Sequence, residues 1–295
     1  MKLGLGTVQF GLDYGVSNSA GVTPEAEAAR ILGLAAGQGV RILDTATGYG
    51  NSEEVLGRTL PTQHRFAVVT KTPAQRADET GDAYIERVGE SFRRSLSKLG
   101  QEELYGVLVH RAEDLLSVHG ERLMGVLLEL KQQGLVKKVG VSVYNAAQID
   151  AVMARHSVEL VQLPVSVLDQ RLITSGHLAA LKRAGVEIHS RSAFLQGLLL
   201  MPPENLPAYF SPIRNHLSCY RDYLESLGLT PLQAALGFVL GLPELDHVIL
   251  GVNTATQLQE VLAARAAQVD AYAMTQFALT DLAMLDPSRW HLNQA

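Results

Sequence analysis

The chain has 295 residues, of which 47% are hydrophobic and 19% are charged, and its formal net charge at pH 7 is −5. This composition is typical of a soluble globular protein, and the acidic balance provides no basic surface for nucleic acid or an anionic membrane. The length allows two domains, but it is equally typical of one α/β barrel with a large core.

A single cysteine, Cys219, excludes a disulfide within the chain and a cysteine-rich metal cage. The segment 1–6 lacks the continuous apolar stretch of a signal peptide, and no run of about 18 apolar residues is present that could span a bilayer. We therefore expect a cytoplasmic protein with no metal, no membrane contact and no nucleic-acid partner. The subunit number stays open, because a monomer and a dimer both suit the sequence.

Short apolar runs alternate with stretches of helical period along the chain. The predicted strands are 3–8, 41–44, 66–71, 104–110, 138–142, 160–163, 186–190 and 248–251. The first predicted helix opens with Thr23 as N-cap and Pro24 at its first position, and Gly37 and Gly39 close it. The other predicted helices are 53–60, 83–99, 115–133, 146–155, 176–184, 231–240 and 255–264.

This alternation predicts a (β/α)₈ TIM barrel, because parallel strands need crossover helices and closure removes both exposed edges. A doubly wound sheet is the competing architecture, and a dinucleotide-binding glycine motif would favour it. Gly4 and Gly6 are followed by Thr7, Val8 and Gln9, which does not match that motif. No Ser/Gly-rich linker is present, so we expect one domain over 1–295, with a long loop or lid at about 195–230 and a tail from about 265.

Three successive predicted strands end in polar residues, namely Asp44, Lys71 and His110. In a barrel these ends lie side by side at the C-terminal face, where active sites are found. Tyr49 follows Asp44 by five residues in a glycine-rich loop, so it belongs to the same group. The four side chains suit proton donation to a carbonyl oxygen that is receiving a hydride.

Each side chain has a distinct expected task. The ammonium of Lys71 should lower the pKa of the Tyr49 phenol, and Asp44 should keep that ammonium charged despite its burial. A neutral His110 could donate a hydrogen bond that orients the substrate oxygen. Taken singly, these residues could instead be a turn aspartate, an interfacial tyrosine, a solvated lysine and a barrel-rim histidine, but their joint placement makes coincidence a poor explanation.

Four motifs resemble those of the aldo/keto reductases, in the same order, over most of the chain from the first strand to about residue 264. They are Asp44-Thr45-Ala46-Thr47-Gly48-Tyr49-Gly50-Asn51-Ser52-Glu53, Val69-Thr70-Lys71, Val109-His110 and Gly140-Val141-Ser142. The resemblance implies a (β/α)₈ barrel that binds NADP or NAD without a Rossmann domain. It further implies Tyr49 as general acid, Lys71 and Asp44 as its tuning pair, and His110 as the residue that orients the carbonyl.

The resemblance also implies a set of cofactor contacts. Ser142 and Gln162 would hydrogen-bond the nicotinamide carboxamide, although a structural hydrogen bond inside the barrel is the alternative for Gln162. Gly6 and Thr7 would face the ribose, or would simply form a tight turn. The complete set is Gly6, Thr7, Asp44, Ser142, Gln162, Ser190, Arg191, Ser192, Gly251, Asn253, Thr254 and Gln257.

The sequence departs from the family pattern at two strand ends. Val143 follows Ser142 where the family often has asparagine, so one amide contact is lost. At the seventh strand end, Arg191 replaces the common aromatic residue that stacks on the nicotinamide. Its guanidinium plane could also stack on an aromatic ring, with an ion pair at the barrel rim as the equally weighted alternative.

The segment 251–256 leads into a helix whose first N–H groups would suit a pyrophosphate, with ordinary capping by Asn253 or Thr254 as the alternative. Between residues 251 and 264 the only charged residue is Glu260, with Arg265 just beyond. An enzyme that prefers NADP would be expected to place a basic residue here against the 2′-phosphate. We therefore expect a weakened preference for NADP and possible use of NAD.

Three further segments resemble a short bacterial branch of the family that is often linked to sugar and surface-polysaccharide biosynthesis. They are 189–200, 162–164 and 168–171, whereas Val165 and Ser166 depart from that branch. Candidate residues of the substrate pocket, chosen from loop positions, are Phe10, Tyr14, Gln75, Arg76, Tyr209 and Phe210.

The leading hypothesis is an NAD(P)-dependent oxidoreductase that interconverts a small polar or sugar-like carbonyl compound and its alcohol. An NAD-dependent aldose 1-dehydrogenase, with Tyr49 acting as base, is the alternative within enzymes. A cofactor-binding regulatory or partner protein with little turnover is the alternative from another class. It is disfavoured because a protein that only binds the cofactor does not need Tyr49 and Lys71 together.

Overall fold

Strands β1 to β8 close into a parallel barrel in sequence order, with β8 paired back onto β1. We describe the barrel from a computed structural model, which covers residues 1–62 and 65–290. The strands are β1 (Leu3–Gly6), β2 (Ile42–Asp44), β3 (Ala67–Lys71), β4 (Leu104–Val109), β5 (Val136–Ser142), β6 (Leu160–Pro164), β7 (Glu187–Arg191) and β8 (His247–Gly251). The predicted (β/α)₈ fold is confirmed, and each predicted strand is present with its bounds shifted by at most two residues.

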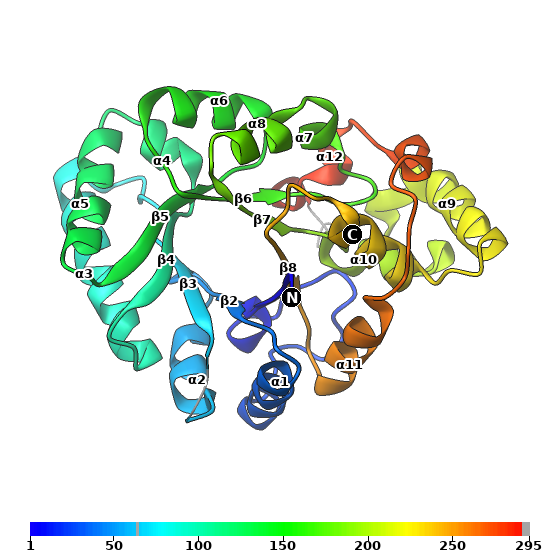
Figure 1. The fold of residues 1–295 in the computed structure, drawn as a ribbon, viewed down its shortest axis with the longest axis horizontal. Helices are drawn as coiled ribbons and strands as arrows, with labels where there is room; N and C mark the ends of the chain where they lie inside the picture. Colours follow the sequence, from blue (N-terminus) through cyan, green and yellow to red (C-terminus); the bar gives the residue numbers. More distant parts are fainter. Residues whose placement is uncertain (63–64, 291–295) are drawn as a thin grey trace.

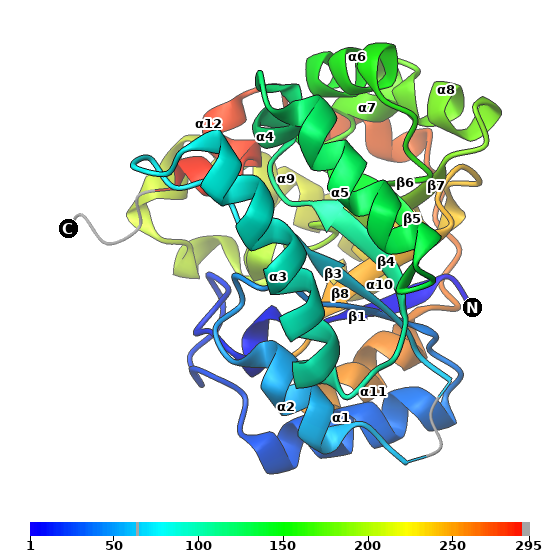
Figure 2. The same cartoon turned by 90° about the vertical axis from the view of Figure 1, so that its left-hand side faces the viewer.

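Helices surround the barrel and carry the chain from each strand to the next (Figures 1 and 2). The crossover helices are α1 (Glu25–Gly37), α2 (Ser52–Thr59), α3 (Gly81–Leu99), α5 (Gly120–Gln132), α6 (Ala146–Arg155), α8 (His177–Arg183) and α10 (Pro231–Gly241), and α11 (Ala255–Ala264) follows the last strand. Shorter or additional helices are α4 (Ala112–Leu116), α7 (Arg171–Thr174), α9 (Arg214–Ser226) and α12 (Leu282–Leu285). The 3₁₀ turns are η1 (Val8–Phe10), η2 (Leu195–Leu200), η3 (Pro203–Asn205), η4 (Ala208–Ile213), η5 (Ala273–Phe277) and η6 (Pro287–Arg289).

Two apolar layers hold the barrel together. Alternate strand residues point outward and pack against the helices in one large buried cluster. The opposite set points inward and forms a smaller cluster, which consists of Ile42, Val69, Leu108, Leu160 and Ile249. Glycines make room for these inward side chains, since an ideal Cβ on Gly4 would lie 2.5 Å from Cδ1 of Ile249. The filled interior thus supports the C-terminal ends of the strands.

Two details of the predicted helices are wrong. Pro24, and not Thr23, is the N-cap of α1, and Thr23 donates its hydroxyl to the Asn253 carbonyl instead. The helix predicted at 115–133 is broken into α4 and α5. At this break the chain turns so tightly that the backbone at Gly120 contacts the backbone at Leu115. A Cβ on Gly120 would lie only 1.8 Å from the Leu115 carbonyl oxygen.

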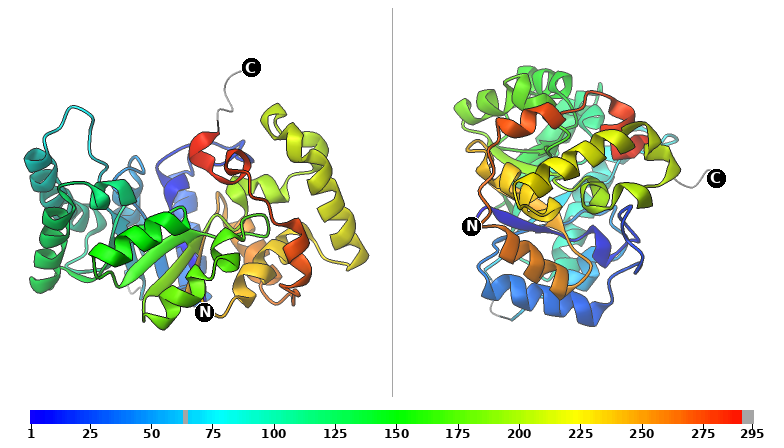
Figure 3. Two further views of the ribbon diagram at one scale, coloured as in Figure 1. Left: turned by 90° about the horizontal axis from the view of Figure 1, so that it is seen from above. Right: turned by 90° about the vertical axis from the view of Figure 1, so that its right-hand side faces the viewer.

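The segment 195–230, predicted as a loop or lid, consists largely of 3₁₀ turns and helix α9. It is packed against the C-terminal segment, and Figure 3 shows α9 beside the red end of the chain. Phe210 contacts Trp290 edge to face at 4.9 Å between centroids, and Phe277 contacts Tyr220 in the same way at 5.1 Å. Four prolines in 202–212 interrupt the helical period, and this explains why the sequence pattern indicated a loop.

Among the described residues, no single helix has the length and hydropathy of a membrane span. One pair of helical segments, Ala208–Ser226 and Pro231–Gly241, reaches those values only when joined, and the two are bent by 88°.

Candidate active site

Lys71 and Asp44 form a buried ion pair at the ends of β3 and β2. The Lys71 Nζ atom donates to both carboxylate oxygens of Asp44, at 2.8 and 2.7 Å, and to the Thr45 carbonyl at 3.0 Å. The lysine is 1% exposed and the aspartate 4% exposed. Burial alone would lower the pKa of Lys71, but the charge and hydrogen bonds of Asp44, together with Tyr49, raise it above the usual value. The ammonium therefore keeps its charge inside the protein.

Tyr49 lies beside this ion pair, with its hydroxyl 3.3 Å from Lys71 Nζ. The ammonium is also 4.9 Å from the centroid of the tyrosine ring. Burial raises the pKa of Tyr49, and the opposing effect of Lys71 is smaller, so the net direction is upward. Lys71 lowers the pKa of Tyr49 as the sequence predicted, but the larger effect of burial, which was not predicted, reverses the net direction. The physical result is a phenol that keeps its proton and holds it beside a fixed positive charge.

His110 follows β4 and faces the Tyr49 ring edge to face, with 6.0 Å between centroids. Its backbone N–H donates to the Thr72 hydroxyl at 3.2 Å. Burial, assisted by the charge of Lys71, lowers the pKa of His110 from 6.5 to about 4. The imidazole is therefore neutral at pH 7 and able to donate one hydrogen bond. The structure thus brings Asp44, Tyr49, Lys71 and His110 together.

The lowered pKa of His110 predicts a pH dependence of stability. Between about pH 6.5 and about pH 4, the unfolded chain binds a proton at this residue and the folded chain does not. The free energy of unfolding should therefore fall as the pH is lowered through this window. Urea unfolding of the wild type and His110→Gln across the window measures the difference, and the variant should lose less stability than the wild type. Identical pH profiles would contradict the assignment.

Gln162, on β6, holds Asp44 in place, because its side-chain amide donates to Asp44 Oδ1 at 2.7 Å. The structural hydrogen bond considered as the alternative for this residue is thus present. The amide oxygen of Gln162 is not used in that bond. Ser142 pairs with Gln162 in register at the end of β5, so the two polar side chains lie next to one another.

Thr7 supports Asp44 from the other side. Its N–H and its hydroxyl both donate to the Asp44 carbonyl, at 2.9 and 3.0 Å. Ser52 in turn donates to the Thr7 carbonyl at 2.8 Å. Thr7 therefore forms the tight turn that was its alternative role, and it also lines the cavity.

The Tyr49 loop is pressed against the turn that follows β1. A Cβ on Gly11 would lie 1.9 Å from the Tyr49 carbonyl oxygen, and a Cβ on Gly50 would lie 2.2 Å from the Gly11 carbonyl oxygen. Gly50 also has a φ of +56°, which glycine adopts without strain. Two glycines thus allow backbone contact between the loop that carries the phenol and the loop 11–20.

A cavity of about 460 Å³ opens beside Tyr49 and runs along the ends of β1 and β8. The candidate residues that line it are Gly6, Thr7, Tyr14, Asp44, Tyr49, Gln162, Arg191, Ser192, Gly251, Asn253, Thr254 and Gln257. Of the described residues, the candidates Phe10, Lys71, Gln75, Arg76, His110, Ser142, Ser190, Tyr209 and Phe210 do not line it.

Ser190 faces away from the cavity because of its place on β7. It pairs in register with Leu163 and Val248, which belong to the outward-facing core, whereas Arg191 next to it points inward. The predicted strand ended at Ser190, but β7 continues through Arg191. Because side chains alternate along a strand, Ser190 lies on the helix side and Arg191 on the interior side.

The remaining pocket candidates lie elsewhere. Phe10 is 1% exposed and belongs to the hydrophobic core, and Phe210 is fully buried beneath the C-terminal segment. Tyr209 donates its hydroxyl to the Ala283 carbonyl at 3.0 Å. Gln75 and Arg76 pack toward the start of α3, where the Gln75 side chain donates to the Glu79 carbonyl and the Arg76 N–H donates to the Glu79 carboxylate.

Arg191 stacks on Tyr144, with its guanidinium carbon 4.1 Å from the ring centroid. It also donates to the Val143 carbonyl at 3.3 Å. None of the ion pairs among the described residues includes Arg191, so the rim ion pair that the sequence allowed is not found. The guanidinium lines the cavity with one face held by an aromatic ring.

The start of α11 is capped within the chain. Thr254 accepts from the Gln257 N–H at 3.1 Å, and the Glu27 carboxylate accepts from the Ala255 N–H at 2.7 Å. The Gln257 side chain accepts from the Asn253 N–H at 2.7 Å. Ordinary capping, the alternative considered for this segment, is therefore what the structure shows.

The cavity has two features that suit an elongated polar ligand such as a nicotinamide dinucleotide. The side-chain oxygen Oε1 of Gln9 lines it, is buried and has no hydrogen-bond partner among the described residues, so it can accept from a ligand hydroxyl. A Cβ on Gly251 would lie 2.4 Å from Gln9 Nε2, so glycine is needed to keep that amide in place. The residues present therefore fit the cofactor.

Sequence reasoning missed several wall residues. Gln9 carried no recognisable signal, since it lies in a short 3₁₀ turn outside any motif. Gln196 and Gly197 line the cavity from a turn in which Gln196 has a φ of +56°. The Gln196 side chain donates to the Tyr14 hydroxyl at 3.1 Å, and its carbonyl accepts from the Val16 N–H at 3.0 Å. Contacts between distant loops of this kind leave no periodic pattern.

Comparison with known proteins agrees with this geometry. Residues 2–279 match the model of the aldo/keto reductase family. The chain is 28% identical to L-galactose dehydrogenase of Arabidopsis thaliana, over 84% of this chain and 81% of that protein. It is 27% identical to the NADH-specific methylglyoxal reductase of Escherichia coli, over 55% of this chain and 54% of that protein.

A solved structure supports the fold alone. The holo form of an aldo-keto reductase from Bacillus halodurans superposes with a TM-score of 0.74 at 21% identity, over 94% of this chain and 90% of that chain. The match to the family model, in contrast, covers nearly the whole chain. The chain belongs to the aldo/keto reductase family, and the protein is therefore an oxidoreductase that uses a nicotinamide cofactor on a small carbonyl compound.

Proposed function

We propose that the protein interconverts a small polar carbonyl compound, such as a sugar derivative, and its alcohol, with Tyr49 as general acid and base. The observation that carries the proposal is the contact of 3.3 Å between the charged Lys71 and the hydroxyl of Tyr49, which lines the cavity. A phenol in this position can donate its proton while the phenolate that forms stays next to an ammonium.

Each polar residue then has a step in the reduction. A bound nicotinamide cofactor supplies the hydride. Tyr49 gives its proton to the carbonyl oxygen, and Lys71, held charged by Asp44, stabilises the resulting phenolate. Neutral His110 donates a hydrogen bond to the same oxygen and thereby orients the substrate. In the oxidative direction Tyr49 would take the proton back.

The cofactor would be held by residues from several strand ends. The free amide oxygen of Gln162, together with Ser142, would bind the carboxamide, and Gln9 would accept from a ribose hydroxyl. These assignments rest on their place in or beside the cavity wall and on the family pattern. The capped start of α11 leaves fewer free N–H groups for a pyrophosphate than the sequence suggested.

We infer that NADH is the better cofactor. Glu260 lines the cavity near Asn253 and Gln257, where a 2′-phosphate would bring additional negative charge. Arg191 is the one basic residue among the described wall residues. Its charge lowers the pKa of Tyr49 and of His110, so it lies toward the reacting end of the cavity. Like charges repel, so Glu260 should weaken NADPH binding.

Steady-state kinetics with both cofactors tests this preference. We expect kcat/KM for NADPH to be no higher than that for NADH. Glu260→Gln should lower KM for NADPH several-fold because it removes the repulsion, and should leave the NADH parameters unchanged within about twofold, which makes NADH the internal control. A hundredfold advantage for NADPH in the wild type would contradict the inference and require another basic residue at the phosphate.

An NAD-dependent aldose 1-dehydrogenase is the second candidate. It is favoured by the 28% identity to a protein named L-galactose dehydrogenase. A panel of aldoses with NAD, and of aldehydes and ketones with NADH, separates the two. Faster turnover of carbonyl compounds supports the reductase, and faster oxidation of aldoses supports the dehydrogenase. Absence of turnover in both panels, with cofactor still bound, would contradict the proposed function.

A further inference from the structure

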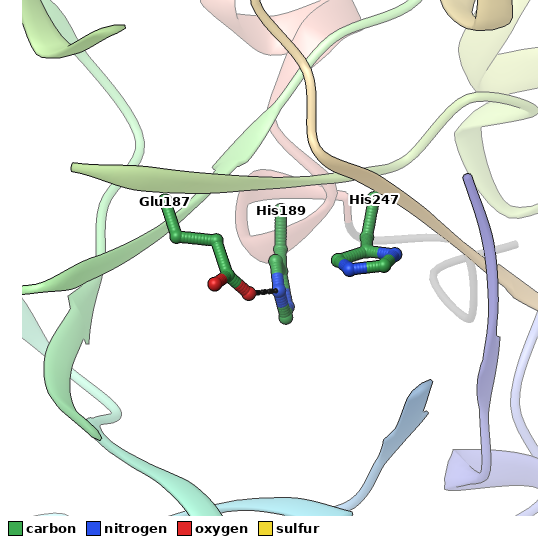
Figure 4. A group of neighbouring side chains, drawn as sticks. All are labelled: Glu187, His189 and His247. Atoms are coloured by element: carbon green, nitrogen blue, oxygen red, sulfur yellow. Dashed lines mark hydrogen bonds and ion pairs between the residues drawn. The ribbon is translucent and has the colours of Figure 1, made fainter. Parts of the chain in front are cut away.

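A second polar cluster lies inside the barrel and takes no part in the mechanism above. Glu187 and His189 are two residues apart on β7, so their side chains point to the same interior face. His247, the first residue of β8, pairs in register with His189. The two imidazole rings meet edge to face, with 5.0 Å between centroids. Figure 4 shows the three side chains extending in the same direction from adjacent segments.

Hydrogen bonds inside the cluster leave two ring nitrogens unused. The Nε2 atom of His189 lies 2.6 Å from Glu187 Oε1, while Glu187 Oε2 accepts from the Tyr105 hydroxyl at 2.7 Å. The Nδ1 atoms of His189 and His247 are both buried and have no hydrogen-bond partner among the described residues. His189 is fully buried, so its ring lies away from bulk solvent. Each ring therefore has a nitrogen without a hydrogen bond inside the barrel.

We propose that Glu187, His189 and His247 bind one divalent transition-metal ion, and that Zn²⁺ is the ion that fits them best. One ligand atom from each residue lies within 4.8 Å of the other two. Two imidazole nitrogens and one carboxylate oxygen form a recurrent zinc donor set that leaves a fourth position for water. Ca²⁺ and Mg²⁺ fit poorly because they prefer oxygen ligands.

Lys138 opposes a cation at this position, but it does not block the site. Its ammonium pairs with Oε2 of Glu187, on which Tyr105 also donates, so Oε1 remains on the side of His189. The Lys138 side chain is 31% exposed and can turn toward solvent when an ion arrives. Half-buried Glu187 and His247 provide access from the end of the barrel opposite Tyr49.

A bound ion would link the neighbouring strands β7 and β8 on their interior face. His189 also pairs in register with Gln162, the residue whose amide donates to Asp44. The ion would therefore stabilise the part of the wall that supports the catalytic ion pair. Because it binds the folded chain, Zn²⁺ should raise the melting temperature in proportion to the logarithm of its concentration.

Calorimetric titration of the chelator-treated full chain with Zn²⁺ tests the proposal. We expect one ion per chain, with an affinity that falls at least about tenfold in His247→Gln and in Glu187→Gln, since even loss of a residue that only orients a ligand has this effect. His177→Gln is the matched control, because His177 pairs with Asp150 on the surface and should not change the affinity. Circular dichroism verifies that each variant is folded.

Co²⁺ provides a readout that needs no variant. The wild-type chain with one equivalent of Co²⁺ should show the intense visible bands of a four-coordinate ion with nitrogen ligands. A spectrum like that of hydrated Co²⁺ would overturn the proposal. So would the absence of saturable binding, or equal affinity in the wild type and in folded His247→Gln. Sequence reasoning predicted no metal, because Glu187 and His247 are 60 residues apart and match no metal-binding motif.

Discussion

Replacing Tyr49 with phenylalanine should lower kcat for carbonyl reduction by about 10²–10⁴-fold, the usual effect of losing a positioned proton donor. The ring and its contact with His110 remain, so the cavity should keep its shape. Cofactor affinity, measured by titration of NADH, should change by less than about twofold. Single-turnover kinetics would show that the chemical step, and not cofactor binding, is lost.

Tyr272→Phe is the matched control for this experiment. It removes a phenol hydroxyl from a side chain that is 84% exposed and lies outside the cavity wall. We expect its kinetics to equal those of the wild type. If Tyr49→Phe retained more than about a tenth of wild-type turnover, another group would have to supply the proton and the role given to Tyr49 would be wrong.

Removing the charge of Lys71 should affect both stability and activity. Lys71→Met leaves Asp44 buried without its cation, and breaking a buried ion pair from one side typically costs about 3–5 kcal/mol. The free energy of unfolding, from urea titration, should fall by this amount. Reduction should fall at least as far as in Tyr49→Phe, because the phenolate loses its stabilising charge.

The double variant Asp44→Asn with Lys71→Met separates the two effects. It removes the uncompensated carboxylate, so part of the lost stability should return, whereas activity should not. Lys131→Met is the control, since Lys131 pairs with Glu159 near the surface and should cost at most about 1 kcal/mol. Full activity in the double variant would contradict the role of the pair.

The strand ends could be predicted from the sequence because the signal is local. Ile42, Leu43 and Asp44 already contain both the buried strand and its polar end, and the same holds for 68–71. Barrel topology then places these ends together without further information. The places of Asp44, Lys71 and His110 at neighbouring strand ends were therefore predictable, since each depends only on its own strand.

Positions that depend on contacts between distant segments could not be predicted. Ser190, Arg191 and Ser192 were predicted together, but side chains alternate along β7, and the register with β6 and β8 places Ser190 on the helix side. Phe210 suggested a lid, yet it is buried and packs against Trp290, which is 80 residues away. The net direction of the Tyr49 pKa could not be predicted for a similar reason. The sequence showed the nearby charge, whereas the stronger effect of burial requires the packed structure.

The contact between Gly11 and Gly50 limits how this enzyme can evolve. A side chain at either position would push apart two backbones that now touch, and the displacement would reach the phenol of Tyr49 and the loop 11–20 at once. That loop contributes Tyr14 and its neighbours to the cavity wall. Ligand-binding residues in the loop can therefore be exchanged singly, but the path of its backbone cannot be remodelled without moving the group that transfers the proton.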